Sequence, residues 1–309
     1  MKIAVVGTGT MGQLFGTLLI DAGHDVVMID TSASLRDRIR RDGLTLRMGQ
    51  STTHVAARAE IAADVHDPVD LVVVFTKSMH SEAALASVAH LVAAHTVGLS
   101  VQNGLGNEGP LAAHFGLDRT VVGVTDYPAD RGSAGEISSS VAGSVTLGGL
   151  TPAAAVHAGR LVEALRAAGF TAESAADISV PIWEKAIFNA VMNTVSASTG
   201  LTVGQMGTLA PAQMLSEGVL TECFAVAQAC GVRFHEARVQ QKVARAFREH
   251  GEHKTSMLQD LEAGRATEIE GTGGALARAG AERGVATPVL ATLSNVVRLR
   301  TLAAQGERE

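Results

Sequence analysis

The sequence predicts an α/β doubly wound sheet followed by an all-α region, within a chain of 309 residues. Three observations lead to this prediction. Short apolar runs alternate with helical stretches from Lys2 to about Val124, and a glycine-rich turn directly follows the first run. From Pro181 onward, almost every segment shows the 3.6-residue apolar period of a helix. The change of pattern divides the chain into an expected domain at 1–176 and a second at 177–309.

Five apolar runs predict the parallel strands of the sheet. Each run is apolar throughout, which is typical of strands that are covered on both faces. These runs are Ile3–Val6, Asp25–Ile29, Leu71–Phe75, Val97–Val101 and Thr120–Val124. The helices expected between them are Gly12–Ala22, Ser34–Arg41, Ser78–Ala94 and Asn107–His114. Strand and helix thus alternate in the order of a doubly wound sheet.

Two further pairs of short runs predict β-hairpins that interrupt this order. Leu44–Leu46 and Thr53–Ala56 flank a glycine, and Ile137–Val141 is joined to Ser144–Leu147 by a short Ala-Gly link. A helix is then expected at about Thr151–Ala168, and after it the strand signals stop.

The composition limits the class of protein. The 25 basic and 31 acidic residues give a net charge of −6, which argues against nucleic acid as a partner. No apolar run approaches the ~20 residues that cross a bilayer, so no membrane partner is expected. Cys223 and Cys230 lie too far apart on one expected helix to form a disulfide, as is usual in a reducing compartment. The strand at the N-terminus leaves no room for a signal peptide, so we expect a cytoplasmic protein. We also expect no metal site.

The glycine-rich turn predicts a dinucleotide site. Its sequence, Gly7-Thr8-Gly9-Thr10-Met11-Gly12, has the G-x-G-x-x-G spacing between a strand and a helix. Gly7 permits the tight turn, Gly9 lets a pyrophosphate approach the backbone, and Gly12 lets the helix pack on the strand. The free N–H groups at the start of the helix, which includes Thr10 and Met11, attract phosphate. A purely structural glycine turn is the alternative, and the strand and helix on either side favour the dinucleotide.

Asp30, at the end of the second strand, bears on the choice of cofactor. A carboxylate there accepts hydrogen bonds from the ribose hydroxyls of NAD and repels the additional phosphate of NADP. Arg36 and Arg38 fall inside the next helix, where they can equally be solvated. We therefore favour NAD as the cofactor, with NADP as the open alternative.

A stripe of polar residues interrupts the apolar helix that begins near Pro181. Lys185, Asn189 and Asn193 recur every four residues and so fall on one face. Burying such groups without partners costs about 1–3 kcal/mol each. Two interpretations follow, a structural polar network between helices or a row of donors that lines a cleft for an oxygen-rich ligand. We favour the second.

The segment from Ser256 to Ile269 holds two more candidates. Glu268 precedes an apolar run that predicts another buried helix, and Ser256 begins an earlier helical stretch. Each has a structural alternative, since Glu268 suits the start of a helix and Ser256 suits a helix cap.

Together these segments resemble the ketopantoate reductase family, also called 2-dehydropantoate 2-reductases. The resemblance extends from Met1 to Pro288. It rests on the glycine-rich turn, Lys77 after Val74-Phe75-Thr76, the turn Gln102-Asn103-Gly104-Leu105-Gly106, the helix with Trp183-Glu184-Lys185, Asn189 and Asn193, and the block Ser256-Met257-Leu258-Gln259-Asp260 to Thr267-Glu268-Ile269.

The resemblance implies an N-terminal Rossmann-type domain, an all-α C-terminal domain and an active site in the cleft between them. Lys185 matches the catalytic lysine that donates a proton to the carbonyl oxygen as hydride arrives from the nicotinamide. Glu268 matches the acid that hydrogen-bonds the substrate hydroxyl. Asn103 matches a residue beside the nicotinamide that helps to hold the lysine and the cofactor.

The resemblance also implies binding roles for four residues. Lys77 matches a residue that contacts the cofactor, and Ser256 matches the ligand of the substrate carboxylate. Asn189 and Asn193 match residues that bind the hydroxyl end of the substrate. The implied reaction is the reduction of ketopantoate, a small 2-keto acid, to pantoate in pantothenate biosynthesis.

Two departures from the family pattern keep alternatives open. Asp30-Thr31 replaces the basic residue that reads the 2′-phosphate, and Val203 replaces an asparagine that some members use on the substrate. An NAD-dependent dehydrogenase of another branched or aromatic 2-keto acid is therefore one alternative, and a non-catalytic dinucleotide-sensing regulator is another. Lys185 and Glu268 favour an enzyme, because a sensor needs no proton donor. A homodimer is a further possibility, since buried helices can face a subunit partner.

Overall fold

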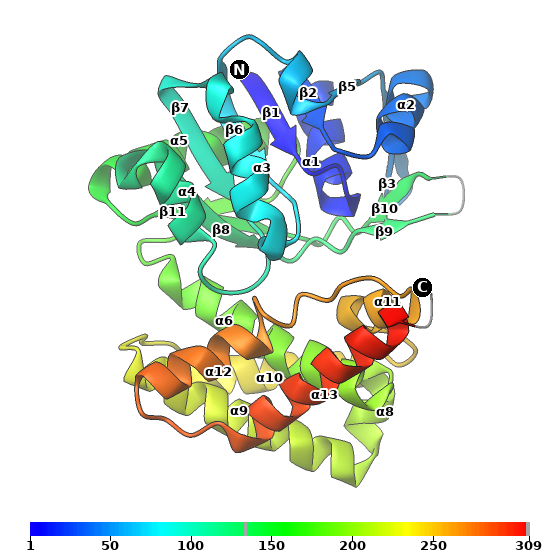
Figure 1. Cartoon of the computed structure of the whole chain (residues 1–309), viewed down its shortest axis with the longest axis vertical. Coiled ribbons are helices and arrows are strands. Elements are labelled where there is room, and N and C mark those ends of the chain that lie inside the picture. The colour runs from blue at the N-terminus through cyan, green and yellow to red at the C-terminus, as the bar shows by residue number, and fades with distance from the viewer. Residues whose placement is uncertain (133–134, 307–309) are drawn as a thin grey trace. The chain divides into compact units, whose positions relative to one another are not determined.

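The computed structural model describes residues 1–132 and 135–306, which divide into two compact units (Figure 1). The first unit comprises Met1–Gln102 and Asn107–Ile178. The second begins at Ser179 and also includes the turn Asn103–Gly106. A four-residue turn thus belongs to the second unit by its contacts, although the first unit surrounds it in the sequence.

The first unit contains an eight-stranded sheet in the order β12-β11-β8-β7-β6-β1-β2-β5. Neighbouring strands run parallel except for β8 and β11, which are antiparallel. The strands are β1 (Lys2–Val6), β2 (Asp25–Ile29), β5 (Arg58–Glu60), β6 (Val69–Val74), β7 (Val92–Ser100), β8 (Thr120–Thr125), β11 (Val145–Gly149) and β12 (Ala172–Ser174). The five predicted strands are all present, and the doubly wound fold is confirmed.

Helices cover both faces of this sheet. Helices α1 (Thr10–Asp21) and α5 (Pro152–Ala167) share one apolar core, to which β1 contributes Ile3 and Val5. Helices α3 (Ser81–Ser87) and α4 (Glu108–Phe115) share the other core, to which β1 contributes Ala4 and Val6. Because successive residues of a strand point to opposite faces, both sets are buried and the run is apolar throughout. Helix α2 (Ala33–Asp42) follows β2 and packs against β5.

The helix predicted at Ser78–Ala94 is wrong in its length. The chain forms a 3₁₀ turn at Ser78–His80, then α3, and a second 3₁₀ turn, Ala89–Leu91. Strand β7 already begins at Val92, which pairs with Val69 of β6. Pairing with a neighbouring strand therefore overrides the local helical preference of these alanine-rich residues.

A second sheet of four strands, in the order β4-β3-β10-β9, packs against α1. The first predicted hairpin is confirmed, since β3 (Leu44–Met48) and β4 (Ser51–Val55) pair antiparallel. The second predicted hairpin is wrong. Strand β10 (Ile137–Ser139) pairs with β3 and with β9 (Asp130–Arg131), whereas β11 pairs with β8 and β12 of the large sheet. The apolar pattern identifies both strands, but their partners lie far away in the sequence, in Leu44–Met48 for β10 and Thr120–Thr125 for β11.

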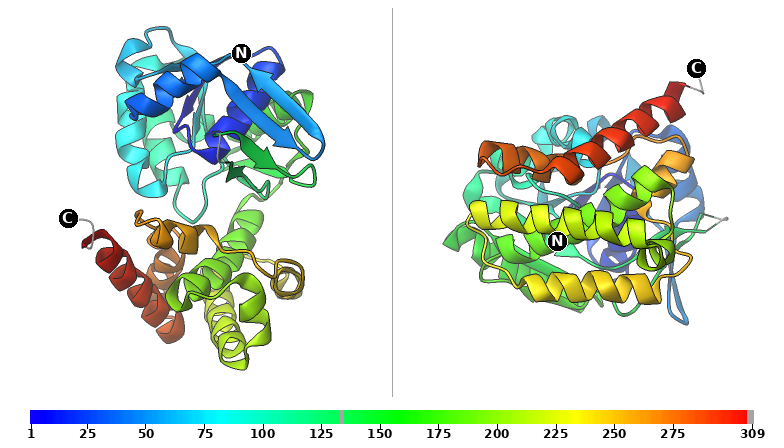
Figure 2. Two further views of the ribbon diagram at one scale, coloured as in Figure 1. Left: turned by 90° about the vertical axis from the view of Figure 1, so that its right-hand side faces the viewer. Right: turned by 90° about the horizontal axis from the view of Figure 1, so that it is seen from below.

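In the second unit, the described residues from Ser179 to Gly306 form helices joined by loops, with no strand among them (Figure 2). This confirms the all-α prediction. Helix α9 (Ala210–Ala229) packs against α8, α12 and α13. The others are α6 (Ser179–Asn189), a π-helical turn at Ala190–Thr194, α7 (Val195–Thr199), α8 (Val203–Thr208), α10 (Glu236–Glu249), α11 (Ser256–Glu262), α12 (Gly273–Glu282) and α13 (Pro288–Gly306). Of the helices in the described ranges, none has both the length and the apolar character to span a membrane.

Candidate functional site

The glycine-rich turn connects β1 to α1 in the first unit. Gly7 has a φ of +92°, and a side chain there would place its Cβ 2.6 Å from the backbone nitrogen of Thr76. A Cβ at Gly12 would collide with the carbonyl oxygen of Gly7. At Gly9, the N-cap of α1, a Cβ would meet nothing within 4 Å. Two of the glycines are thus required by packing, while the third faces open space at the start of a helix, where a pyrophosphate fits.

Asp30 is fixed beside this turn by hydrogen bonds. Its Oδ2 accepts from the backbone nitrogen of Thr8 at 2.9 Å and from Thr8 Oγ1 at 2.7 Å. Its Oδ1 accepts from the backbone nitrogen of Ser32 at 2.9 Å. Arg36 donates to the carbonyl oxygen of Asp30, and Arg38 donates to that of Gly135. The role of Thr8 was not predicted, although it lies within the motif.

Lys77 follows the carboxyl end of β6, where it precedes the 3₁₀ turn at Ser78–His80. The buried side chain of Gln102, at the end of β7, binds this segment. Gln102 Nε2 donates to the carbonyl oxygen of Thr76 at 2.6 Å and to Ser81 Oγ at 2.9 Å. Ser100 Oγ donates to Gln102 Oε1 at 2.7 Å. Gln102 therefore links the ends of two neighbouring strands, which the sequence analysis did not foresee.

A small polar pocket lies within the second unit. Four residues singled out in the sequence line it, namely Asn103, Asn193, Ser256 and Glu268. Met257, Asp260 and Thr272 complete the lining and were not predicted. The pocket therefore joins the turn 103–106 to the π-helical turn, to α11 and to the segment between α11 and α12, all far from it in the sequence.

The asparagines of the polar stripe contact this pocket lining. Asn189 Nδ2 donates to Asn103 Oδ1 at 3.5 Å, and both Asn189 and Asn193 are buried. Ser256 Oγ and the backbone nitrogen of Met257 both lie 3.4 Å from Asn193 Oδ1. These hydrogen bonds are longer than the usual range and therefore weak. Ser256 itself is not the helix cap, because Thr255 occupies that position.

A π-helical turn separates the two asparagines of the stripe. It comprises Ala190–Thr194, directly after Asn189, and Asn193 lies within it. Lys185 is half-buried and lies four residues before Asn189 on the same helix.

Glu268 lies in the segment between α11 and α12, and α12 begins only at Gly273. It is therefore not at the start of that helix. Its carbonyl oxygen accepts from the backbone nitrogen of Gly271 at 3.1 Å and from Thr272 Oγ1 at 3.0 Å. The carbonyl oxygen of Gly271 in turn accepts from the backbone nitrogen of Leu105 at 3.0 Å. This contact fastens the turn 103–106 to the segment that carries Glu268.

Asp260 was not predicted as a site residue, and Val203 does not lie where the sequence led us to expect it. Asp260, on the pocket wall, forms an ion pair of 2.8 Å with Arg265, and its place in the block from Ser256 to Asp260 was the signal that could have identified it. Val203 is 3% exposed and packs in the apolar core at the start of α8, so it does not line the pocket. Across residues 1–132 and 135–306, no cluster of three metal-binding side chains occurs.

The two units define a class of protein. One carries a dinucleotide-type glycine turn with an adjacent carboxylate, and the other carries a pocket of amide, hydroxyl and carboxyl groups. Sequence profiles of the ketopantoate reductase family match both parts, "Ketopantoate reductase PanE/ApbA" over residues 3–152 and its C-terminal counterpart over residues 177–301. The chain belongs to the ketopantoate reductase family.

Individual relatives agree with this assignment. The chain is 31% identical to the 2-dehydropantoate 2-reductase of Halobacterium salinarum, covering 97% of this chain and 98% of the relative. It is 30% identical to that of Lactococcus lactis, covering 96% and 97% of the two chains. Among solved structures, a D-mandelate dehydrogenase with NADH and anilino(oxo)acetate has a TM-score of 0.92, with 28% identity and coverage of 98% and 99%. The 2-dehydropantoate 2-reductase of Geobacter metallireducens has a TM-score of 0.88, with 29% identity and coverage of 97% and 99%.

Proposed function

We propose that this chain is a 2-dehydropantoate 2-reductase, which reduces ketopantoate to pantoate with a reduced nicotinamide dinucleotide. The segment 1–176 binds the cofactor in this proposal, and the segment 177–309 supplies the substrate pocket and the catalytic groups. The observation that carries the proposal is the pocket lined by Asn103, Asn193, Ser256 and Glu268. It gathers, within one unit, residues that match the substrate-binding pattern of the family.

Lys185 serves as the general acid in this proposal. When bound, the nicotinamide supplies the hydride that adds to the keto carbon. Negative charge then builds on the carbonyl oxygen, and the Lys185 ammonium stabilises this charge and delivers the proton. Asn103 orients the reacting groups, and its bond with Asn189 holds its side chain in place.

The polar groups on and beside the pocket suit a substrate that carries a carboxylate and a hydroxyl. Ser256 Oγ and the backbone nitrogen of Met257 are two donors side by side, which suits a carboxylate. The side chains of Asn189, Asn193 and Glu268 are amide and carboxyl groups, which suit a substrate hydroxyl. Ketopantoate has such a hydroxyl, whereas a purely hydrocarbon or aryl side chain offers these polar groups no hydrogen bond. The core position of Val203 removes the main argument for an aryl substrate.

NADH is the proposed preferred cofactor, with Lys77 as an additional contact. Thr8 and Ser32 hold the Asp30 carboxylate beside the glycine turn, where it repels a 2′-phosphate. The nearby Arg36 and Arg38 both donate to backbone carbonyl oxygens, which supports the same preference.

We propose that the enzyme acts in the cytoplasm on a small-molecule substrate, without a nucleic-acid or membrane partner. Cys223 and Cys230 are both free thiols, which suits a reducing compartment. A homodimer stays a prediction, which light scattering of the purified protein tests directly.

The substrate assignment is tested with a panel of 2-keto acids and both reduced cofactors. The panel contains ketopantoate, which carries the hydroxyl, 2-ketoisovalerate, which lacks it, and phenylglyoxylate, which carries an aryl ring instead. Turnover is followed by the loss of nicotinamide absorbance. We expect the highest kcat/KM with ketopantoate. A preference for phenylglyoxylate would instead assign the aryl 2-keto acid dehydrogenase, and cofactor binding without any turnover would assign the regulator.

The role of Lys185 is tested by Lys185→Ala. We expect kcat to fall by roughly two to four orders of magnitude, because acid catalysis and oxyanion stabilisation are lost together. The control is Lys242→Ala. Lys242 is an exposed lysine on α10 of the same unit, and its Nζ lies 5.1 Å from the centre of the Phe188 ring. An unchanged rate for Lys185→Ala would remove this residue from the mechanism.

A further inference from the structure

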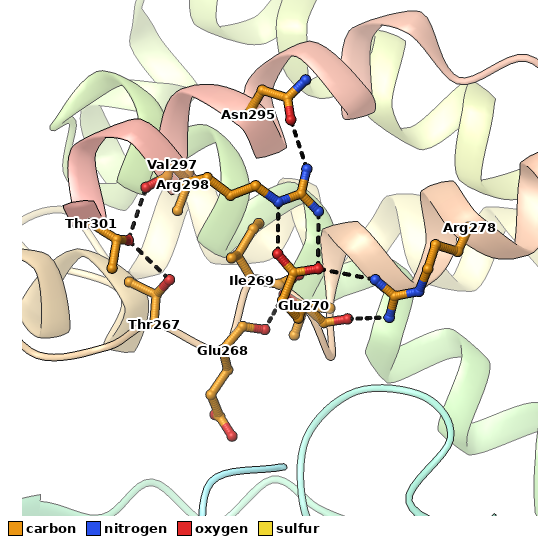
Figure 3. Close-up of polar contacts among 10 residues, drawn as sticks. Thr267, Glu268, Ile269, Glu270, Arg278, Asn295, Val297, Arg298 and Thr301 are labelled. Carbon is orange, nitrogen blue, oxygen red and sulfur yellow. Dashed lines mark hydrogen bonds and ion pairs between the residues drawn. The ribbon is translucent and has the colours of Figure 1, made fainter. Parts of the chain in front are cut away.

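Glu270, two positions after Glu268 in the sequence, lies at the centre of a cluster of charged residues (Figure 3). Arg298 donates from Nε to Glu270 Oε1 at 2.6 Å and from Nη2 to Oε2 at 3.0 Å. Arg278 donates from Nη1 to the same Oε2 at 3.0 Å. Two guanidinium groups, from α12 and α13, thus bind both oxygens of one carboxylate.

The cluster also holds the backbone of this segment. Arg278 Nη2 donates to the carbonyl oxygen of Glu270 at 2.7 Å, so that Arg278 binds both the side chain and the main chain of one residue. A Cβ at Gly274 would lie 2.9 Å from Arg298 Nη2 and 3.0 Å from Glu270 Oε2. The space for the ion pairs therefore depends on a glycine. Arg298 is itself held by Asn295, whose Oδ1 lies 2.7 Å from Nη1.

The segment fixed in this way carries the pocket residues. Figure 3 shows that the Glu268 side chain points away from the charged cluster, on the other side of the backbone. Glu268 also shares a short hydrogen-bonded turn with Gly271 and Thr272, and Thr272 lines the pocket. Through Gly271, the same turn binds Leu105 of the turn that contains Asn103. A shift of Glu270 is therefore transmitted to two sides of the pocket.

The ion pairs of this cluster are partly exposed. The side chains of Glu270, Arg278 and Arg298 are 52%, 58% and 36% exposed, so solvent screens their contribution to the free energy of unfolding. A bidentate network with two arginines does fix a local geometry. Hydrogen bonds from Arg298, and then from Arg278, keep the pKa of Glu270 below its ordinary value. The carboxylate is thus charged at neutral pH.

We propose that Glu270, held by Arg278 and Arg298, is a positioning residue that sets the place of Glu268 in the pocket. It touches neither substrate nor cofactor and acts through Glu268. The inference rests on the proposed function, in which Glu268 binds the substrate hydroxyl.

The test is a double-mutant cycle of Glu268→Gln and Glu270→Gln. We expect Glu270→Gln alone to raise the KM for ketopantoate and to lower kcat/KM by about tenfold, because a small displacement of a binding group weakens its contact. The KM for the cofactor should not change. In the Glu268→Gln background, the second substitution should lower kcat/KM by less than about twofold, because Glu270 no longer has a group to position. Equal losses in the two backgrounds, or no loss in either, would overturn the proposal.

The matched control is Glu262→Gln. Glu262 forms an exposed ion pair of 2.6 Å with Lys254 at the end of the neighbouring helix α11, and its loss should leave the kinetics unchanged. Glu270→Asp keeps the charge and should recover part of the lost kcat/KM.

Hydrogen exchange separates this proposal from the function on which it rests. We expect the backbone amides of Leu105 and Gly271, which close the turn beside Glu268, to exchange faster in Glu270→Gln than in the wild type or in Glu262→Gln. Unchanged exchange would contradict the positioning role. If the wild type failed to reduce ketopantoate while these amides still responded, the proposed substrate would be wrong and the structural link correct.

Discussion

The substitution Gly104→Ala tests how closely the turn 103–106 is fitted to the segment that carries Glu268. Gly104 has a φ of +93°, and a Cβ there would collide with the carbonyl oxygen of Gly271. That oxygen accepts the hydrogen bond from the backbone nitrogen of Leu105. A single methyl group therefore acts on the backbone conformation and on the contact between two pocket-forming segments.

The magnitude follows from two contributions. Alanine at positive φ costs about 1–2 kcal/mol relative to glycine. Displacing the Gly271 carbonyl weakens or breaks one hydrogen bond, with a further loss of about 1 kcal/mol. We therefore expect Gly104→Ala to lower the free energy of unfolding of the helical unit by about 2–3 kcal/mol. The KM for ketopantoate should also rise, because Asn103 and Glu268 line the same pocket.

Gly106→Ala is the matched control, because Gly106 has a similar φ of +87° but a Cβ there would meet nothing within 4 Å. It should cost only the conformational part, about 1–2 kcal/mol, and leave the KM nearly unchanged. Urea unfolding followed by circular dichroism gives the free energies, and steady-state kinetics gives the KM. Equal effects of the two substitutions would refute the close contact between Gly104 and Gly271.

Two other predictions concern the first unit. Asp30→Ala should lower kcat/KM with NADH and raise it with NADPH, because the carboxylate that repels the 2′-phosphate is removed. A wild type that already prefers NADPH would contradict the proposed cofactor preference. Gln102→Leu should destabilise the unit by about 1–3 kcal/mol, because Ser81, Ser100 and the carbonyl oxygen of Thr76 lose their partner. Thermal unfolding measures this loss, and an unchanged melting temperature would show that other groups replace those bonds.

Local patterns were sufficient to predict most of the secondary structure. Continuous apolar runs such as Ile3–Val6 identify buried strands, because the whole signal lies within a few consecutive residues. The 3.6-residue period identifies the helices after Pro181 in the same way. The spacing of Lys185, Asn189 and Asn193 also placed three candidate residues on one helix, although it did not reveal the π-helical turn that contains Asn193.

The sequence by itself therefore determined the two kinds of fold, the glycine-rich turn and the polar stripe, since each depends on neighbouring residues. The tertiary structure alone decided which strand pairs with Ile137–Ser139 and where the helix after Ser78 ends. It also decided that the turn 103–106 packs against Gly271, more than 160 positions away. Such contacts depend on burial and hydrogen bonding between distant segments, and no local pattern of residues encodes them.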